Sequence, residues 1–428
     1  MKVHLVTLGC PKNAVDSAGM AALLRRAGHT LVERPRPADV LVVNTCGFIA
    51  PAREEALQVL RALGAKKRPG QVLIAAGCMA GPYGDMLRAV PGVDALLPTE
   101  RWAEIVPLVA RLTRQAAAVV PEVARAGLSA VQGGSAYLKI AEGCSAGCAF
   151  CTIPRIKGPY RSFPAADLVA EARALVDGGV REIVLVAQDT TFYGRDRGER
   201  DGLADLIEAI LAAAPDLPWL RIMYTFPGHI TSRLIDVLAG HPQVCPYLDI
   251  PLQHAHPAVL RRMGRPANVR AVRALLHRLR AAIRDLVLRT TFIVGYPGET
   301  EEEFAALREF LQEEAFERVG VFPYYCEEGT AAAALPGPLP AEVAARRREE
   351  LLTIQQDIAR QWGQRQVGRV VEVLVEGVEK DLVVGRTRWD APEVDGLVLA
   401  QGQARIGEIV PVKLTAASDY DLWGEVVR

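Results

Sequence analysis

Three cysteines in the middle of the chain have a spacing that suits an iron–sulfur cluster. Cys144, Cys148 and Cys151 lie in the segment Glu-Gly-Cys-Ser-Ala-Gly-Cys-Ala-Phe-Cys. Three thiolates this close together can ligate three corners of one cubane, and Gly143 and Gly147 allow the tight loop. A structural zinc site would normally need a fourth Cys or His nearby, and the segment has none. The spacing therefore predicts a cluster in which one iron has no protein ligand.

Three further cysteines, Cys10, Cys46 and Cys78, each follow a short β-branched run. The carboxyl ends of parallel strands lie along one edge of an open sheet, so these thiols are expected to converge. Thiolates favour iron–sulfur clusters, zinc or copper. A single buried cysteine is commonly just a small hydrophobic residue, but three in the same context predict a second metal site. Cys245 and Cys326 lack such partners and are expected in the core or a loop.

The elements that must position these cysteines divide the chain into three predicted domains, at residues 1–113, 130–362 and 363–428. The first two alternate β-branched runs with helical patterns, which is typical of α/β folds with parallel sheets. Six strand–helix units in the second predict a partial (βα)6 barrel. The third changes to five short β runs separated by glycine, which predicts a small OB-like β-barrel. Residues 114–134 have the composition of a connector. The expected strands cover residues 3–8, 40–43, 72–76, 137–141, 183–187, 220–224, 247–250, 287–294, 319–324, 370–375, 382–384, 397–399, 408–414 and 424–427.

Composition excludes several classes of protein. Lys plus Arg and Asp plus Glu both total 50, so no overall basic excess indicates a nucleic-acid partner. The apolar runs are far shorter than a bilayer-spanning helix requires. Eight cysteines in a long chain without a secretory signal favour a reducing compartment. We therefore expect a soluble cytoplasmic protein without a membrane partner.

The loop from Cys144 to Cys151, with an aromatic residue, Phe150, before its last cysteine, resembles the signature of the radical S-adenosylmethionine (SAM) superfamily. The resemblance implies that SAM binds the open iron and is cleaved reductively to a carbon radical. It also implies that segments following three barrel strands surround the cosubstrate. The residues that it assigns to SAM binding are Gln188, Asp189, Gln253, Gly295, Pro297 and Gly298.

The order of the three domains, with both cysteine sets in place, resembles the methylthiotransferase family over essentially the whole chain. The resemblance implies two [4Fe–4S] clusters and a carboxy-terminal TRAM domain at residues 363–428. It further implies that a methylthio group is attached to an unactivated carbon, with SAM as both methyl donor and radical source. A radical is needed because no side-chain base could remove a proton from such a C–H bond. An electron donor and a sulfur donor are then required, and no catalytic residue beyond the clusters is identified.

The resemblance implies that the substrate is either a tRNA adenosine or an aspartate β-carbon of small-subunit ribosomal protein twelve, free or in the small ribosomal subunit. Residues 363–428 contain eight Lys and Arg against eleven Asp and Glu. An RNA-binding barrel should have the opposite sign, whereas an acidic one suits a basic ribosomal protein. The segment Asp-Ala-Pro-Glu-Val-Asp-Gly, which ends at Gly396, also resembles the ribosomal-protein branch. We therefore expect that branch and do not favour RNA contact. The alternatives are a tRNA methylthiotransferase and a non-catalytic iron–sulfur protein that binds the ribosome.

Overall fold

The computed structural model describes residues 1–114 and 129–427, and the chain divides into two compact units. The first unit comprises Met1–Ala130, Tyr137–Ala146 and Cys151–Ala174, and the second comprises Val131–Ala136, Gly147–Phe150 and Leu175–Arg428. Of the predicted connector, residues 115–128 lie outside the described part. Its end forms a short strand, β6 (Ala130–Gln132), where no strand was expected. The domain bounds inferred from the sequence stay predictions.

The first unit is built on a parallel five-stranded sheet with the order β2-β1-β3-β4-β5. Helices α1 and α4 cover one face, and helices α2 and α3 cover the other. Because both faces are buried, strands such as β3 are continuous apolar runs rather than alternating ones. The elements are β1 (Lys2–Thr7), α1 (Pro11–Arg26), β2 (Thr30–Leu31), β3 (Val40–Thr45), α2 (Ala50–Ala65), β4 (Val72–Gly77), α3 (Gly84–Arg88), β5 (Ala95–Pro98), the 3-10 helix η1 (Thr99–Glu104) and α4 (Ile105–Thr113).

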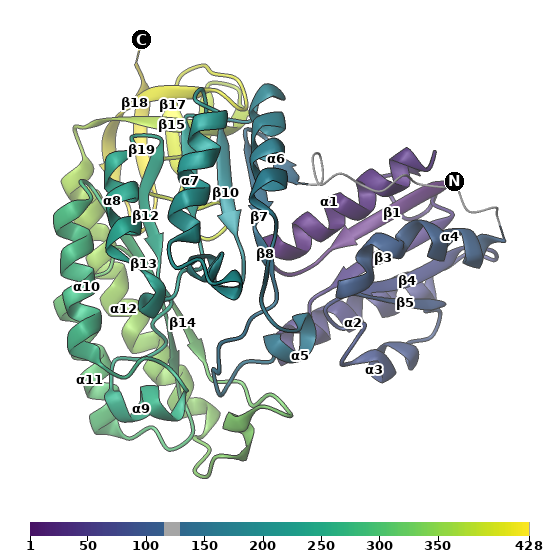
Figure 1. Cartoon of the computed structure of the whole chain (residues 1–428), viewed down its shortest axis with the longest axis horizontal. Helices are drawn as coiled ribbons and strands as arrows, with labels where there is room; N and C mark the ends of the chain where they lie inside the picture. Colours follow the sequence, from purple (N-terminus) through teal and green to yellow (C-terminus); the bar gives the residue numbers. More distant parts are fainter. Residues whose placement is uncertain (115–128, 428) are drawn as a thin grey trace. The chain divides into compact units, whose positions relative to one another are not determined.

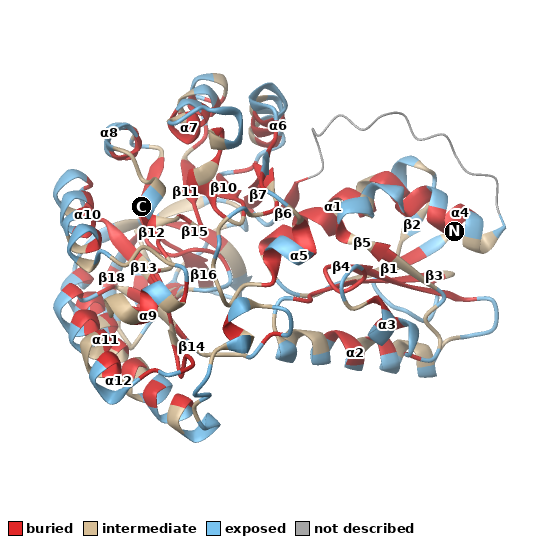
Figure 2. Cartoon of the chain, turned by 60° about the horizontal axis from the view of Figure 1, so that its bottom comes forward, coloured by how far each residue is buried: buried red, intermediate tan, exposed pale blue. Residues whose placement is uncertain are grey.

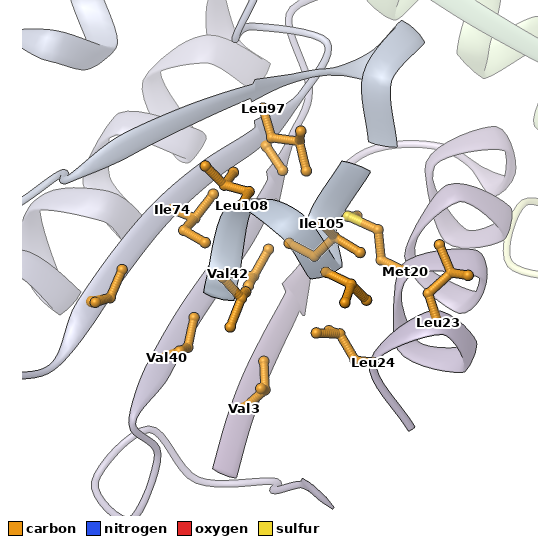
Figure 3. Close-up of a cluster of buried hydrophobic side chains, with 14 residues drawn as sticks. Val3, Met20, Leu23, Leu24, Val40, Val42, Ile74, Leu97, Ile105 and Leu108 are labelled. Atoms are coloured by element: carbon orange, nitrogen blue, oxygen red, sulfur yellow. The ribbon is translucent and has the colours of Figure 1, made fainter. Parts of the chain in front are cut away.

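The core between this sheet and helices α1 and α4 is closely packed (Figure 3). Val3, Val42 and Ile74 from three neighbouring strands contact Leu24 of α1 and Ile105 of α4, and all five are buried. Each such side chain contributes roughly 1.5–3 kcal/mol when it is fully buried. This packing holds the carboxyl ends of β1, β3 and β4 in register at one edge of the sheet.

Three short elements complete the first unit beside the cysteine loop. They are β8 (Ala141–Glu142), α5 (Ile153–Lys157) and β9 (Arg161–Ser162), with β8 and β9 antiparallel. Strand β8 ends directly before the loop, and α5 begins directly after it. The loop between Cys144 and Cys151 is thus anchored at both ends by regular structure.

A seven-stranded sheet has the order β14-β13-β12-β11-β10-β7-β6, and its strands β10 to β14 lie in the second unit. From β10 to β14 the neighbours are parallel, which confirms the predicted partial barrel. Figure 1 shows α7, α8, α10 and α11 outside the strands, and in Figure 2 the outward faces of α10, α11 and α12 are exposed while their inward faces are buried. Two elements, β7 (Ser135–Lys139) and α6 (Ala165–Asp177), have residues in both units. The elements of the second unit are β10 (Glu182–Val186), α7 (Gly202–Ala213), β11 (Trp219–Ile222), α8 (Ser232–Gly240), β12 (Val244–Asp249), α9 (Pro257–Arg262), α10 (Val269–Ala282), β13 (Val287–Val294), α11 (Glu301–Glu314), β14 (Arg318–Pro323) and α12 (Ala341–Gln366).

The carboxy-terminal strands form a closed barrel with the order β15-β16-β17-β19-β18. This confirms the predicted OB-like architecture, and closure removes the free edges of the sheet. Val373, Val383, Val398 and Val412 fill its interior. The strands are β15 (Val370–Glu379), β16 (Leu382–Arg386), β17 (Val398–Gln401), β18 (Ile409–Ala417) and β19 (Leu422–Val426).

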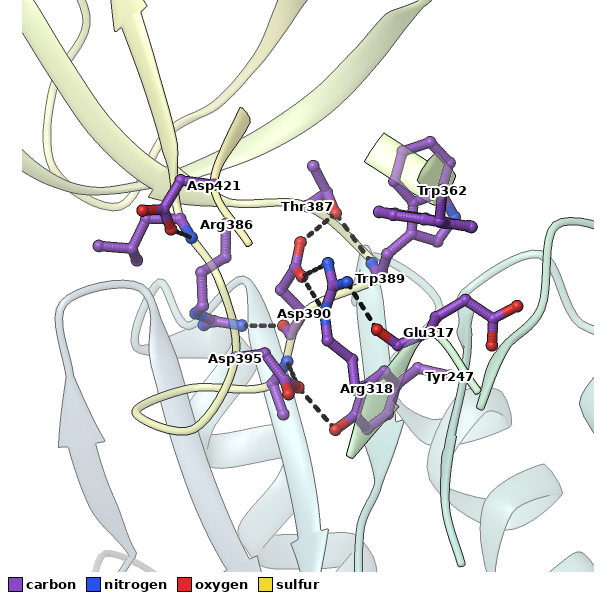
Figure 4. Close-up of polar contacts among 12 residues, drawn as sticks. Tyr247, Glu317, Arg318, Trp362, Arg386, Thr387, Trp389, Asp390, Asp395 and Asp421 are labelled. Carbon is purple, nitrogen blue, oxygen red and sulfur yellow. Dashed lines mark hydrogen bonds and ion pairs between the residues drawn. The ribbon is translucent and has the colours of Figure 1, made fainter. Parts of the chain in front are cut away.

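The loop between β16 and β17 packs against strands β12, β13 and β14, and its contacts on β13 and β14 lie near the starts of those strands (Figure 4). Asp390 accepts a hydrogen bond from Arg318 at 2.6 Å. Asp395 accepts one from the hydroxyl of Tyr247 at 2.7 Å and pairs with Arg289 at 3.4 Å. Both carboxylates are almost fully buried, with 2 % of each side chain exposed. We call residues 387–397 the docking loop.

The burial of the docking loop removes the basis for inferring a basic partner from the acidic excess in residues 363–428. Asp390 and Asp395 belong to the Asp-Ala-Pro-Glu-Val-Asp-Gly segment, yet their charges are neutralised inside the molecule by arginines of the central barrel. Within residues 363–427, six acidic and five basic residues are exposed, so the surface of this barrel is close to neutral. Formal charge along the sequence therefore does not identify the partner, because burial removes part of that charge from the surface.

None of the helices within residues 1–114 and 129–427 is long and apolar enough to cross a membrane.

Candidate iron–sulfur and cosubstrate site

Backbone N–H groups are directed at two of the three sulfurs of the cysteine loop. The N–H of Ala146 points to the sulfur of Cys144 at 3.5 Å, and the N–H of Ile153 points to that of Cys151 at 3.5 Å. Such donors stabilise thiolates and tune the potential of the clusters they bind. The thiolate donor set and these amides fit an iron–sulfur cluster.

Only one of the two glycines of the loop is required by its geometry. Gly143 has φ +79°, and a Cβ there would lie 2.1 Å from the carbonyl oxygen of Pro159. Gly147 has no positive φ, and a Cβ there would meet nothing within 4 Å. The expectation that both glycines permit the tight loop is therefore supported at Gly143 and not at Gly147.

The aromatic residue before the last cysteine acts as an anchor in the second unit. Phe150 and Ala149 pack against an apolar cluster that includes Val259, Met263 and Tyr296. The N–H of Ala149 also donates to the carbonyl of Met263 at 2.9 Å. These contacts fix the two residues between Cys148 and Cys151, which explains why a bulky apolar side chain is suited to position 150.

The three cysteines of the first unit lie just past adjacent strands β1, β3 and β4, as the sequence predicted. A Cβ on Gly9 would lie 2.7 Å from the Cβ of Cys46, so the segments that carry Cys10 and Cys46 are in close contact. The thiol of Cys78 donates to the side-chain oxygen of Asn13 at 3.3 Å. In the described part of the chain, no three Cys, His, Asp or Glu side chains already have the geometry of a metal site.

Burial keeps the thiols of Cys46 and Cys78 protonated when no metal is bound. It raises the pKa of Cys78 to about 12, against the opposing charge of Lys157, and it also raises the pKa of Cys46. Metal binding must then displace protons from the sulfurs, as for other buried thiolate sites. Soft thiolate ligands such as these suit an iron–sulfur centre better than a hard cation.

A buried charge network lies beside Cys78 and was not foreseen from the sequence. Lys157 of α5 contacts Asp16 of α1 at 3.1 Å, Glu142 at 3.2 Å and the hydroxyl of Thr99 at 2.5 Å. Lys139 also pairs with Asp16 and, at 2.7 Å, with Glu142. Burial alone would raise the pKa of Glu142, but the two lysines lower it to about 2. The network ties α1, which follows Cys10, to both ends of the Cys144–Cys151 loop.

The residues assigned to SAM lie at the carboxyl ends of β10, β12 and β13, where parallel barrels place their ligand sites. Gln188 and Asp189 follow β10. Both carboxylate oxygens of Asp189 have partners, the hydroxyl of Thr191 at 2.6 Å and His229 at 2.7 Å. Phe226 stacks on the ring of His229 at 4.8 Å. Asp189 is thus held in one orientation by side chains that the sequence did not single out.

Gln253 is fixed by its backbone in a left-handed conformation, with φ +75°. Its N–H donates to Thr291 and its carbonyl accepts from Ile293, both at 2.8 Å, which extends the pairing of β12 with β13. The side chain is therefore presented from a rigid turn rather than from a mobile loop.

Gly295, Pro297 and Gly298 form a turn after β13 that is organised by Glu299. The carboxylate of Glu299 accepts the N–H of Gly295 and, at 3.0 Å, that of Tyr296. Glu299 is itself fully buried and pairs with Arg347 at 3.4 Å and His254 at 3.6 Å. Glu299 is a positioning residue that the sequence reasoning did not assign. It directly follows Gly298 in the segment Gly-Tyr-Pro-Gly-Glu, and that position could have indicated its role.

Comparisons with known proteins agree with this geometry. The chain matches the radical SAM superfamily over residues 138–311, the uncharacterized protein family UPF0004 over residues 2–98 and the TRAM domain over residues 367–427. Among solved structures, the radical SAM methyltransferase TsrM from Kitasatospora setae has a TM-score of 0.52 at 14% identity, covering 82% of this chain and 84% of that one. The cobalamin-dependent SAM radical enzyme OxsB has a TM-score of 0.53 at 12% identity, covering 83% and 56%. Likeness at this identity shows the fold alone.

Fold and site together define a radical SAM enzyme, a class that works with a [4Fe–4S] cluster and SAM. Curated relatives named "Ribosomal protein uS12 methylthiotransferase RimO" align over the full chain. The relative from Roseiflexus sp. (strain RS-1) is 50% identical over 100% of this chain and 98% of its own length. The relative from Chloroflexus aurantiacus is 49% identical over 100% of both chains. The chain belongs to the RimO family of radical SAM methylthiotransferases.

Proposed function

We propose that this chain attaches a methylthio group to the β-carbon of an aspartate in ribosomal protein uS12. The observation that carries the proposal is the combination of two three-cysteine sets with full-length similarity to relatives named for that reaction. Cys144, Cys148 and Cys151 would hold one [4Fe–4S] cluster. The set at the carboxyl ends of β1, β3 and β4, which is Cys10, Cys46 and Cys78, would hold the second.

The residues of the barrel would bind and orient the cosubstrate. When bound, the cluster with the open iron supplies the electron that cleaves SAM reductively to a carbon radical. Asp189, held by Thr191 and His229, and the turn organised by Glu299 would keep SAM in one orientation at the carboxyl ends of the strands. Gln188, Gln253, Gly295, Pro297 and Gly298 would complete its contacts.

The reaction requires partners that the chain itself does not contain. An electron donor must reduce the cluster, and a sulfur donor must replace the sulfur atom that is transferred. The protein substrate is uS12, either free or in the small ribosomal subunit, and a cytoplasmic location follows from that substrate. A tRNA adenosine is the alternative substrate, but the relatives that cover the whole chain are named for uS12.

Metal analysis tests the two-cluster assignment first. Reconstituted protein should contain about eight iron atoms and a matching amount of sulfide, four for each cubane. A zinc content of one or two per chain without iron would contradict the assignment. Release of deoxyadenosine from SAM under reducing conditions separates an enzyme from a non-catalytic iron–sulfur protein that only binds the ribosome.

The substrate is tested by mass spectrometry of uS12 and of bulk tRNA from cells with and without this gene. The proposal predicts that the methylthio group is lost from uS12 and that tRNA is unchanged. Loss of the group from tRNA alone would replace the proposal with the tRNA reaction.

A further inference from the structure

Arg265 lies directly beside the middle cysteine of the radical-cluster loop, and no motif marks it. Its Nη1 is 3.7 Å from the sulfur of Cys148. Its Nη2 donates to the carbonyl of Pro251, and its guanidinium lies over the ring of Phe226, 4.1 Å from the centroid. All four residues belong to the second unit. The guanidinium is therefore held on three sides with one N–H directed at the thiol.

The turn that carries Arg265 is fixed against the cysteine segment by its backbone. The N–H of Ala149 donates to Met263 at 2.9 Å, and the N–H of Arg265 donates to Leu260 at 2.8 Å. Gly264, with φ +66°, lies so close that a Cβ there would be 2.4 Å from the carbonyl oxygen of Gly147. The short distance between Arg265 and Cys148 is thus imposed by two interlocked turns, not by one flexible side chain.

The charge of Arg265 is not neutralised by any carboxylate within ion-pair distance in the described ranges 1–114 and 129–427. Its Nε also has no hydrogen-bond partner in those ranges. Arg262, three residues earlier, pairs with Glu303 at 2.7 Å. Arg265 therefore presents an unbalanced positive charge and a directed N–H to the sulfur of Cys148.

We infer that Arg265 hydrogen-bonds the cluster-ligating thiolate of Cys148 and raises the reduction potential of the cluster that Cys148 helps to hold. A donor to a cluster sulfur and a nearby positive charge both stabilise the reduced state, which carries one more negative charge. The consequence is an easier first electron transfer before SAM is cleaved. The inference rests on the proposed assignment of Cys148 as a ligand.

The test is a redox titration of the reconstituted full chain, followed by electron paramagnetic resonance without SAM. The radical cluster is identified as the one whose signal changes when SAM is added. Arg265→Met should lower its midpoint potential by the equivalent of at least tenfold in the one-electron equilibrium, about 59 mV. Arg261→Met removes the same charge from an exposed position four residues earlier and should leave the potential unchanged.

Three further variants, Arg265→Gln, Arg265→Lys and Cys148→Ala, separate the explanations. Arg265→Gln keeps an N–H donor without the charge and should give an intermediate potential. An Arg265→Met or Arg265→Gln protein that holds its cluster at the wild-type potential overturns the inference, as does a variant in which only SAM affinity falls. Loss of the cluster from the Met, Gln and Lys variants alike would show a purely structural role and also overturn it. Cys148→Ala tests the ligand assignment separately, because a SAM-responsive cluster that survives this change contradicts the proposed function itself.

Discussion

At the scale of single residues, the cysteine loop depends on how closely its backbone approaches its neighbours. The backbone of Gly143 is in the left-handed conformation, and a Cβ there would clash with the Pro159 carbonyl oxygen. A Cβ on Gly147 would meet no atom within 4 Å. A side chain at the first position must move the loop, while one at the second need not. From the cysteine spacing alone, both glycines are expected to be equally important for the tight loop. The spacing carries no information on the φ angle of each glycine or on the atoms that face it across the loop.

Gly143→Ala should therefore weaken the radical cluster selectively. The added methyl group would clash with the Pro159 carbonyl and displace the segment that leads to Cys144. We expect iron per reconstituted chain to fall by roughly half, because one of two cubanes is lost. Gly147→Ala is the matched control and should retain its iron. Equal retention by both variants would show that the loop tolerates the displacement.

The residues that support the site were hidden from the sequence because their partners are remote. Arg265 and Cys148 are 117 positions apart, and Lys139 and Asp16 are 123 apart. No periodicity or local motif links such pairs. The six cysteines proposed as cluster ligands could be selected from the sequence because strand ends and a short loop place them by local rules, whereas the positions of the charged residues around them depend on the tertiary fold.

At the scale of elements, the buried network of Asp16, Lys139, Glu142 and Lys157 joins α1 to β7, β8 and α5 in the first unit. Breaking a buried ion pair by removing one partner leaves a charge without compensation. The network should therefore matter far more to stability than the ion pairs on the helix surfaces.

Lys157→Met should lower the free energy of unfolding by about 3–5 kcal/mol, because Asp16 and Glu142 lose one of two lysines inside the protein. Denaturant unfolding of the cluster-free protein measures this. Arg61→Met is the control: its pair with Glu54 is about half exposed and should contribute less than about 1 kcal/mol. Comparable losses in the two variants would refute the structural role assigned to the network.

A second buried carboxylate, Glu182 at the start of β10, predicts acid sensitivity. Burial alone would raise its pKa, but Arg386 and Arg221 lower it from 4.5 to about 2. Its folded pKa is below its unfolded value, so its contribution is fully present above pH 4.5 and is lost as the pH falls toward 2. The contribution amounts to roughly 3 kcal/mol.

Glu182→Gln should accordingly reduce the dependence of unfolding free energy on pH between about 5 and 3, in addition to lowering stability at neutral pH. Urea unfolding of cluster-free protein at several pH values provides the measurement. If the slope in this pH range is the same in the variant and the wild type, Glu182 is not the group that titrates.

The elements themselves were largely predictable. Continuous apolar runs indicated buried parallel strands such as β3. Strand β13 also coincides with the expected residues 287–294. The exceptions have physical causes. Strand β6 forms in the predicted connector because β7 offers an edge to pair with. Helix α12 spans residues 341–366 and crosses the predicted domain boundary at residue 362, because Trp362 and Gln366 near its carboxyl end are buried.

At the scale of the whole molecule, the docking loop connects the carboxy-terminal barrel to central strands, with its ion pairs at Arg289 and Arg318 near the starts of β13 and β14. The candidate site lies at the opposite, carboxyl ends of those strands. The Asp-Ala-Pro-Glu-Val-Asp-Gly segment therefore serves assembly within the chain. The sequence suggested a surface for a basic partner because pairing with Arg318 and Arg289 is not visible in a count of charges.

Asp390→Ala should release this docking. It leaves Arg318 buried without its carboxylate partner, at an expected cost of about 3–5 kcal/mol. Unfolding free energy and protease cleavage within residues 363–369 should both report the change. Glu393→Ala, at an exposed position of the same loop, should change stability by less than about 0.5 kcal/mol. Equal protease resistance of the two variants would contradict the docking role.

The most direct test of the central claim is a purified reaction. The reconstituted chain is incubated with reductant, a sulfide source and SAM, together with either uS12 or bulk tRNA, and the products are examined by mass spectrometry. The account predicts a methylthio group on one aspartate of uS12, accompanied by deoxyadenosine, and no change in tRNA. Modification of tRNA with unmodified uS12, or the absence of deoxyadenosine in both reactions, would contradict it.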